Sequence, residues 1–154
     1  MLCVVDSVAT FAVRHRQFSD EDFIARLGAL AFGEFSSNAG VSTLHMARSD
    51  RTLIATRAEV PIGLAVVQHS SAALSYLKAI AVVEHERGHG VGRLLLTSVE
   101  REARALGATG LRLHTAEANV AALELFLKRG FQINRRMPRF YVGMYDACEL
   151  VKHF

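Results

Sequence analysis

Hydrophobic positions along the chain follow a strand pattern first and a helix pattern later. Residues 52–57, 62–69 and 74–83 are rich in β-branched residues and are separated by short connections. Such runs predict three successive strands in an antiparallel meander. A shorter apolar run at residues 10–18 predicts a strand that precedes them. The first half of the chain is therefore expected to supply one side of a sheet.

A helical spacing of apolar residues appears between the first strand and the meander. Ser19 is placed to cap a helix over residues 20–35, because serine accepts backbone N–H groups at helix starts. One buried stripe is expected there, formed by Phe23, Leu27, Leu30 and Ala31. Residues 36–48 are ambiguous and compatible with a second short helix.

Two clearer helices are predicted in the second half of the chain. The first begins near Val91 and stops at Gly107, a residue type that commonly ends helices. The second begins at the capping residue Asn119 and stops at Gly130. Its inward face is expected to consist of Val120, Leu123, Phe126 and Leu127. Further short strands are predicted at residues 111–114, 131–136 and 144–152.

This order of elements predicts a mixed α/β (α+β) domain with a central sheet. The sheet is expected to hold about six to seven strands, flanked by about four helices. No repeat, linker or low-complexity stretch divides the chain, so one domain over residues 1–154 is expected.

Composition adds little to this picture. Of the 154 residues, 51% are hydrophobic and 21% are charged, as in ordinary soluble domains. Apolar runs have only strand length, so no membrane partner is expected. Residues 1–13 lack a basic start, and Cys3 and Cys148 form no CxxC pair. A cytoplasmic protein without disulfides is therefore expected. The net charge of +3 suits an anionic ligand but is not specific.

The segment with the clearest chemistry is residues 77–96, LKAIAVVEHERGHGVGRLLL. A strand ends there, and a loop with three alternating glycines at 88–92 opens directly into a helix. Glycines let successive backbone N–H groups converge, and the helix start adds its positive dipole end. Arg87 and Arg93 flank the loop with fixed positive charge. The segment predicts a seat for a phosphate or a pyrophosphate.

Two common phosphate-binding motifs do not fit this loop. A Walker loop requires Gly-Lys-Ser/Thr at the helix start, where this chain has Gly92, Arg93 and Leu94. A dinucleotide fingerprint requires a third glycine, and its position is occupied by Arg93 or Leu95 depending on the starting glycine. The preceding strand also belongs to a meander rather than to a βαβ unit.

What remains is Arg87-x-x-Gly90-x-Gly92 after a strand ending Ile80-Ala81-Val82. This pattern resembles the signature of the GNAT superfamily of acetyl-CoA-dependent N-acetyltransferases. The segment from Asn119 to Phe131 resembles the second motif of that superfamily, and the similarity extends over roughly residues 8–152. The tail, with Arg139-Phe140-Tyr141 and Asp146 to Leu150, is similar to the branch that acetylates protein N-termini, including bacterial ribosomal-protein alanine acetyltransferases.

The resemblance implies acetyl-CoA as co-substrate and direct attack by a bound primary amine, without an acyl-enzyme. Ile80, Ala81 and Val82 are then expected to hold the pantetheine and the acetyl group, and Asn119 to contact the pantetheine or its phosphate end. The pyrophosphate is expected at Arg87, Gly88, His89, Gly90, Val91, Gly92 and Arg93. A peptide N-terminus is the first expected acceptor, and a small amine or antibiotic is the alternative. The protein is expected to be a monomer or a homodimer.

The catalytic residues are less clear, because the chain departs from its relatives. In the N-terminal acetyltransferase branch, a Glu often stands where this chain has His114, and a proton-donating Tyr where it has Phe126. His114 suits a general base or is a strand histidine with satisfied nitrogens. Tyr141 is a candidate for the lost acid or an aromatic packed on the sheet. Tyr76 and Glu84 are further candidates. The missing Tyr also favours a rival hypothesis, a non-catalytic acyl-CoA-binding module.

Two other patterns carry weaker chemistry. Residues 85–89, HERGH, match the HExxH zinc motif, but that motif requires a helix, which the glycines disfavour. We therefore expect no metal. A basic cluster, which suits the 3′-phosphate of coenzyme A, an acidic acceptor, RNA or simply a solvated face, consists of Lys128, Arg129, Arg135, Arg136 and Arg139. The solvated face is favoured, and no nucleic acid partner is expected.

Overall fold

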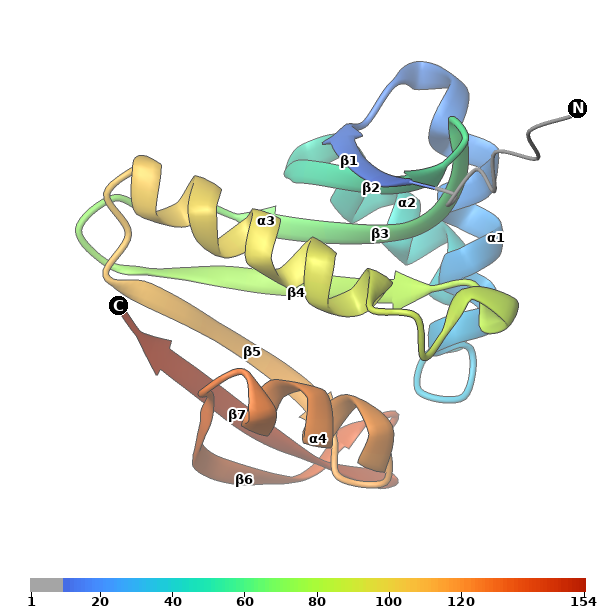
Figure 1. Ribbon diagram of the computed structural model, residues 1–154. Helices are drawn as coiled ribbons and strands as arrows, with labels where there is room; N and C mark the ends of the chain where they lie inside the picture. Colours follow the sequence, from blue (N-terminus) through green and yellow to red (C-terminus); the bar gives the residue numbers. More distant parts are fainter. Residues whose placement is uncertain (1–9) are drawn as a thin grey trace, which may run out of the picture.

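The protein is described by a computed structural model over residues 10–154. Its strands form one seven-stranded sheet in the order β1-β2-β3-β4-β5-β7-β6 (Figure 1). The strands are β1 (Phe11–His15), β2 (Arg51–Arg57), β3 (Val60–Gln68), β4 (Leu74–Val82), β5 (Gly110–Ala116), β6 (Gln132–Tyr141) and β7 (Tyr145–His153). The helices are η1 (Phe18–Asp20), α1 (Glu21–Phe32), α2 (Ala39–Ser49), η2 (Glu84–Glu86), α3 (Val91–Ala105) and α4 (Val120–Lys128).

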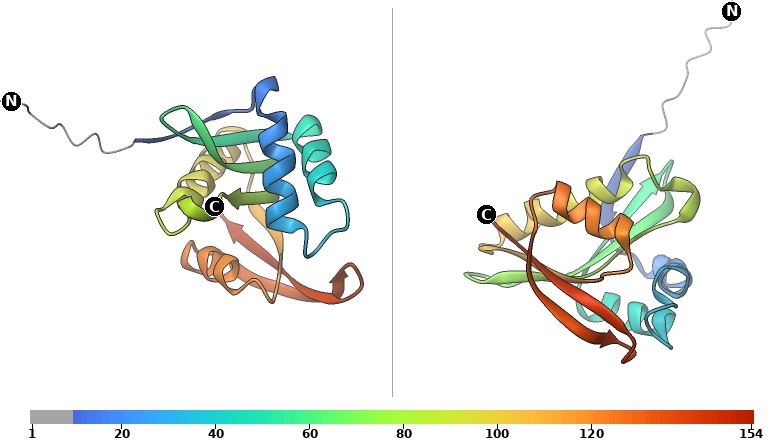
Figure 2. Two further views of the ribbon diagram at one scale, coloured as in Figure 1. Left: turned by 90° about the vertical axis from the view of Figure 1, so that its right-hand side faces the viewer. Right: turned by 90° about the horizontal axis from the view of Figure 1, so that it is seen from below.

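Helices cover both faces of the sheet. Helices α1 and α2 lie on one face, and α3 and α4 lie on the other (Figure 2). Leu95, Leu96 and Val99 of α3 are fully buried in the core on their side. Ile24 and Leu27 of α1 are buried against the sheet on the opposite side. The predicted α/β class and the antiparallel meander β2-β3-β4 are both confirmed.

Strands β4 and β5 meet at a short parallel seam. Their register pairs run only from Leu74 with Gly110 to Leu77 with Leu113. Beyond these pairs β4 continues to Val82 and β5 to Ala116, and the two strands separate (Figure 1). The backbone edges of both strands are thereby left facing a gap in the middle of the sheet. This gap positions the functional site.

The closed end of this seam is tightly packed. A Cβ added at Gly110 would collide with the carbonyl oxygen of Lys152 and lie 2.9 Å from Leu74 Cδ2. Only glycine fits there, because the backbone of β7 approaches the start of β5 too closely for a side chain.

A β-bulge lies in β4 at the point where the seam ends. Val66 pairs with Ala79 and Val67 with Leu77, so Lys78 is the extra residue of the bulge. A bulge bends its strand and redirects a side chain. Here it coincides with the divergence of β4 from β5.

Two expectations about α1 and one about α4 are wrong. Ser19 does not cap α1, because the chain enters through η1, and the Asp20 carboxylate accepts the Gln17 N–H at 2.7 Å. Leu30 is 84% exposed, because α1 turns Gly28 toward Thr43 of α2, and Leu30 lies outside this contact.

In α4, Val120 and Leu127 are exposed and Phe126 is buried, because this short helix contacts the core along one narrow edge.

Among residues 10–154, no helix combines the length and the apolar character that a membrane crossing requires.

Candidate active site

The predicted glycine loop joins β4 to α3 across the open end of the gap. Gly88 and Gly90 have φ angles of 79° and 85°, which side chains rarely adopt. Gly90 is the N-cap of α3. The Arg87 Nε donates a hydrogen bond to the Val82 carbonyl at 3.0 Å, so this guanidinium ties the loop back to the end of β4. The loop conformation therefore depends on its glycines and on Arg87.

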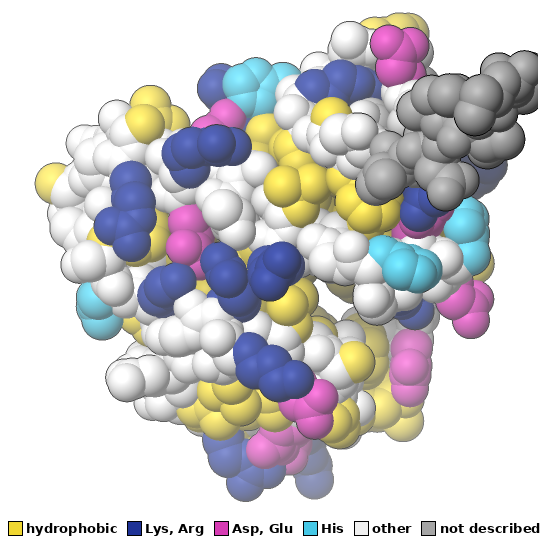
Figure 3. Space-filling model, in the orientation of Figure 1, with side chains coloured by type: hydrophobic (Ala, Val, Ile, Leu, Met, Phe, Trp, Pro, Cys, Tyr) yellow, Lys and Arg dark blue, Asp and Glu magenta, His cyan; other side chains and the backbone are white. Residues whose placement is uncertain are grey.

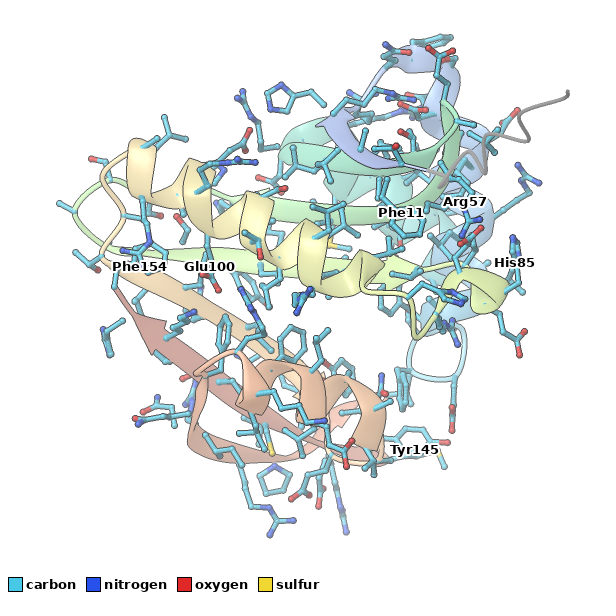
Figure 4. All side chains as sticks on the ribbon, in the orientation of Figure 1. Phe11, Arg57, His85, Glu100, Tyr145 and Phe154 are labelled. Atoms are coloured by element: carbon cyan, nitrogen blue, oxygen red, sulfur yellow. The ribbon has the colours of Figure 1, made fainter. Side chains whose placement is uncertain are left out.

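An ion pair holds the start of the loop. Arg57 of β2 bonds to the buried Glu86 at 2.6 Å, and its guanidinium lies over the Phe11 ring (Figure 4). Residues 85–89 do not form the continuous helix that the HExxH zinc motif requires. Glu86 is paired with an arginine, and η2 ends before Gly88 instead of continuing as a helix. Within the described part of the chain, no three His, Cys, Asp or Glu side chains form a group that could hold a metal ion.

A cavity of about 480 Å³ lies beside this loop and brings most of the predicted cofactor residues together. Its lining includes Ile80, Ala81, Val82, Arg87, Gly88, Gly90, Val91, Gly92, Arg93 and Asn119. His89 is not among the lining residues, and its Nδ1 lies 3.3 Å from the Glu86 carbonyl. We call this space the loop cavity.

The loop cavity fits a diphosphate. The first intrahelical bond at this end of α3 runs from the Leu94 N–H to the Gly90 carbonyl at 3.0 Å. The N–H groups of the preceding residues therefore have no acceptor within the helix and carry the positive end of its dipole. Gly92 lies close to α4 in the cavity wall, since an added Cβ would be only 3.3 Å from Leu125 Cδ2. Lys and Arg side chains also gather on the face that carries α3 and α4 (Figure 3).

A second cavity, of about 210 Å³, adjoins the first within the gap between β4 and β5. We call it the gap cavity. Both cavities are lined by Phe32, Ile80, Asn119, Ala122 and Phe126. The gap cavity extends from there past His114 and Tyr141 to the α1–α2 connection. A molecule bound in one cavity therefore meets a molecule bound in the other near Ile80.

Asn119 combines a structural and a surface role. Its side-chain oxygen accepts the Ala122 N–H at 3.3 Å and caps α4, as expected. That bond uses the oxygen and leaves the amide NH₂ as a donor. Because Asn119 lines both cavities, this donor lies at their junction.

His114 belongs to a hydrogen-bonded chain across three strands. Its Nδ1 lies 2.8 Å from the Tyr76 hydroxyl of β4, and its Nε2 lies 2.9 Å from Glu149 Oε2 of β7. An ionised carboxylate only accepts, so Nε2 carries the proton and Nδ1 accepts from Tyr76 in the neutral ring. The side chain is 10% exposed and faces the gap cavity. Both histidine nitrogens therefore have partners, and the ring still borders the cavity.

Glu149 is the anionic end of this chain. Hydrogen bonds from Asn134 at 2.8 Å and from His114, together with Arg135, lower the pKa of Glu149 to about 2. The carboxylate is therefore ionised at neutral pH, and it is 8% exposed. The sequence alone assigns no role to Glu149 or Asn134. The sequence feature that points to Glu149 is its place as an acid between two apolar residues of β7, Cys148 and Leu150, which are both buried.

The two candidate tyrosines have different surroundings. Burial raises the pKa of Tyr141 to about 12, and this residue lines the gap cavity. Burial also raises the pKa of Tyr76, whose ring lies 4.1 Å from the Arg112 guanidinium carbon. Phe126 is buried and lines both cavities. Glu84 begins η2 and lines neither cavity.

The basic cluster of the C-terminal half is largely paired with acids and hydroxyls. Arg136 bonds to Glu117 at 2.6 Å, Arg135 to Glu149 at 3.4 Å, and Arg129 to Thr97 at 3.1 Å. These contacts are what a solvated and internally compensated face requires.

Comparison with known proteins agrees with this geometry. Residues 14–131 match the acetyltransferase (GNAT) family. Because the match spans more than half of the sequence, the chain belongs to this family.

Particular relatives extend the comparison. The chain is 31% identical over 96 residues to N-alpha-acetyltransferase 30 of Saccharomyces cerevisiae, a match covering 60% of this chain and 54% of the yeast protein. The chain thus spans about half the length of this curated relative.

Solved structures share the fold. Ard1 from Thermoplasma volcanium superposes with a TM-score of 0.81 at 22% identity, over 93% of this chain and 97% of Ard1. The yncA protein of Salmonella typhimurium, solved with its cofactor acetyl-CoA, has a TM-score of 0.78 at 18% identity, over 93% of each chain.

Proposed function

We propose that the protein is an N-acetyltransferase that moves the acetyl group of acetyl-CoA to a primary amine. The observation that supports this proposal most directly is that two cavities meet at Ile80 and Asn119. One cavity has a diphosphate seat, and the other has a histidine paired with a buried carboxylate. A site that joins two substrates in this way supports direct transfer in a ternary complex.

The loop cavity would hold acetyl-CoA, which supplies the acetyl group as a thioester. Arg93 and the helix N–H groups would bind the diphosphate, as their charge and position suit an anion. Ile80, Ala81 and Val82 would hold the pantetheine along the open edge of β4. A backbone N–H of this edge would stabilise charge on the acetyl oxygen.

His114 would act as the general base for the acceptor amine. The amine must lose a proton before or during its attack on the acetyl carbonyl carbon, since only the neutral form has a free electron pair. The proton would end on Nδ1 of His114, directly or through the Tyr76 hydroxyl. Glu149 would stabilise the resulting imidazolium from 2.9 Å.

The leaving sulfur takes the electron pair of the broken carbon–sulfur bond and then a proton. Phe126 has no proton to give. Tyr141 remains protonated at neutral pH, because its pKa is about 12, and it borders the same cavity. We assign Tyr141 as the proton donor. This assistance is worth little, since a thiol has a pKa of about 8.5 and leaves readily as thiolate.

A peptide N-terminus is the proposed acceptor. The name of the yeast relative, N-alpha-acetyltransferase 30, supports this choice. An α-amine has a pKa of about 8, so a neutral histidine suffices to deprotonate it, whereas a lysine amine needs stronger help.

The deciding experiment is the release of free CoA from acetyl-CoA in the presence of short peptides and small amines. Mass spectrometry of each acceptor identifies the acetylated nitrogen. Peptide-dependent release supports the proposal. Tight binding of acetyl-CoA with no turnover across the panel would instead favour a non-catalytic binding module, and turnover of small amines alone would favour the alternative acceptor class.

The role of His114 has its own test. We expect His114→Ala to lower kcat/KM by about a hundredfold and to change its pH dependence, leaving only the contribution of the acceptor amine on the acidic side. An unchanged pH profile would exclude His114 as the base.

A further inference from the structure

Lys78 is the cationic residue of the gap cavity that the proposed mechanism does not use. It is the extra residue of the β4 bulge, one step beyond the last seam pair at Leu77. The bulge places Lys78 in the cavity wall with its neighbours Leu77 and Ala79. A charged side chain at this position costs desolvation, so it calls for a partner.

The Lys78 ammonium has one fixed partner and spare donors. Its Nζ lies 2.7 Å from Asp50 Oδ2, at the end of α2. The Lys78 side chain is 24% exposed, and that of Asp50 is 13% exposed. Asp50 is absent from the cavity wall. An ammonium has three donors, so two remain after the bond to Asp50. The Asp50 carboxylate therefore orients the Lys78 side chain, which lines the cavity and keeps two N–H donors available for a bound anion.

The remaining wall of the gap cavity contains no competing acid. Among the described residues that line it, none is an Asp or a Glu. Hydroxyl groups of Ser36 and Ser42 lie in the same wall and add neutral donors. The other side chains there are largely apolar or aromatic, such as Phe35 and Met46. A polycationic amine would find no counter-charge in this cavity, whereas a carboxylate would find a preoriented ammonium.

We propose that the gap cavity selects acceptors that carry a carboxylate close to the reacting amine, and that Lys78 binds this carboxylate. The inference rests on the proposed acetyltransferase function and specifies its substrate class. The matching acceptors are peptides whose second residue is Asp or Glu. Polyamines and aminoglycoside-like amines are excluded by the same wall.

The test uses three peptides that differ only at the second residue, which is Asp, Asn or Lys after an N-terminal Ser. We expect the wild-type protein to acetylate the Asp peptide with kcat/KM about tenfold above the Asn peptide, and the Lys peptide least. The difference should lie mainly in KM, because Lys78 contacts the acceptor and not the reacting atoms.

The informative variant is Lys78→Met combined with Asp50→Asn. The second change avoids leaving a carboxylate without its partner. In this variant the Asp-over-Asn preference should disappear, with kcat/KM on the Asp peptide falling about tenfold relative to kcat/KM on the Asn peptide. Lys128→Met, at the exposed end of α4, is the matched control and should keep the preference. The swapped pair Lys78→Asp with Asp50→Lys should favour the Lys peptide.

Outcomes separate this inference from the function on which it rests. Equal kcat/KM on all three peptides would overturn the selectivity and leave the acetyltransferase function intact. Absence of turnover on all three peptides would count against a peptide N-terminus as the acceptor. If no peptide is acetylated, calorimetric titration of the same peptides into CoA-saturated protein still measures the contact with Lys78. Equal affinities for the three peptides would overturn the proposed selectivity.

Discussion

The two adjoining cavities are built in different ways. The loop cavity is made mainly by one continuous segment, from Ile80 through Arg93, and its binding groups are largely backbone N–H groups. The gap cavity is made by side chains from β4, β5, α4, the α1–α2 region and Tyr141. The first depends on local conformation and the second on the packing of the whole fold.

This difference separates the proposed cofactor seat from the proposed acceptor site. A backbone seat recognises a group that every acyl-CoA carries, and few side-chain identities affect it. A side-chain wall changes with each substitution and thereby sets the acceptor. Changes at the loop should therefore affect the cofactor alone, and changes at the gap should affect the acceptor or the pH profile.

The largest effect is expected from Gly90→Asp. The new carboxylate would face the diphosphate, and at about 4 Å with a surface dielectric such repulsion is worth about 4 kcal/mol. Affinity for acetyl-CoA should fall by about a thousandfold, since every 1.4 kcal/mol is about tenfold. Isothermal titration with acetyl-CoA measures this loss.

Gly107→Asp is the control for Gly90→Asp. Gly107 has a similar φ of 84°, lies beyond the opposite end of α3, and is absent from the lining of both cavities. This variant pays a comparable backbone cost and should bind acetyl-CoA normally. Equal losses in the two variants would contradict a local diphosphate seat.

A smaller effect is expected from Glu149→Gln, on stability. The carboxylate has a lowered pKa of about 2, so its ionised form stabilises the fold at and above neutral pH. This contribution is complete above the ordinary carboxylate pKa and disappears as the pH falls toward 2. The variant should unfold about 2 kcal/mol more easily at pH 7.

Urea unfolding of both proteins between pH 7 and pH 3 tests this expectation. The difference in unfolding free energy between wild type and Glu149→Gln should become smaller as the pH falls below 5. A difference that stays constant would show that the charge of Glu149 does not contribute to folding. Because His114 bonds to Glu149, the urea series on His114→Ala with and without Glu149→Gln separates the contribution of His114 from that of Glu149.

The smallest effect is expected from Phe126→Tyr. It places a hydroxyl at the junction of the two cavities, where relatives of the N-terminal acetyltransferase branch often carry one. Because the thiolate leaves with little help, kcat should change by less than about threefold. Steady-state kinetics at saturating acetyl-CoA measures it. A tenfold gain would show that proton donation to sulfur limits the present enzyme.

The loop cavity was predictable and the gap cavity was not, for a physical reason. The glycine pattern, the strand end and the helix start of residues 80–93 are adjacent in sequence, so their spacing alone predicts a seat for a phosphate or a pyrophosphate. Asn119 was also predictable, since a helix cap has a local signature. Its position at the junction required the fold.

The polar chain of Tyr76, His114 and Glu149 spans three strands that are remote in sequence. Each residue was ambiguous alone, and Glu149 was overlooked, because register between strands determines which side chains meet. The predicted burial of Leu30 is wrong for a related reason. Helical spacing predicts an apolar side, but the position of α2 beside Gly28 decided which part of it was covered.

The short seam between β4 and β5 makes the sheet resemble a wedge. Its apex is at Gly110, where even a methyl group does not fit, and its mouth is where the two proposed substrates would meet. A side chain at the apex would press on the backbone of β7 and on Leu74 of β4, the two strands on either side of β5. The spacing of β5 from these neighbours, and with it the width of the mouth, would then be set by a residue that lines neither cavity.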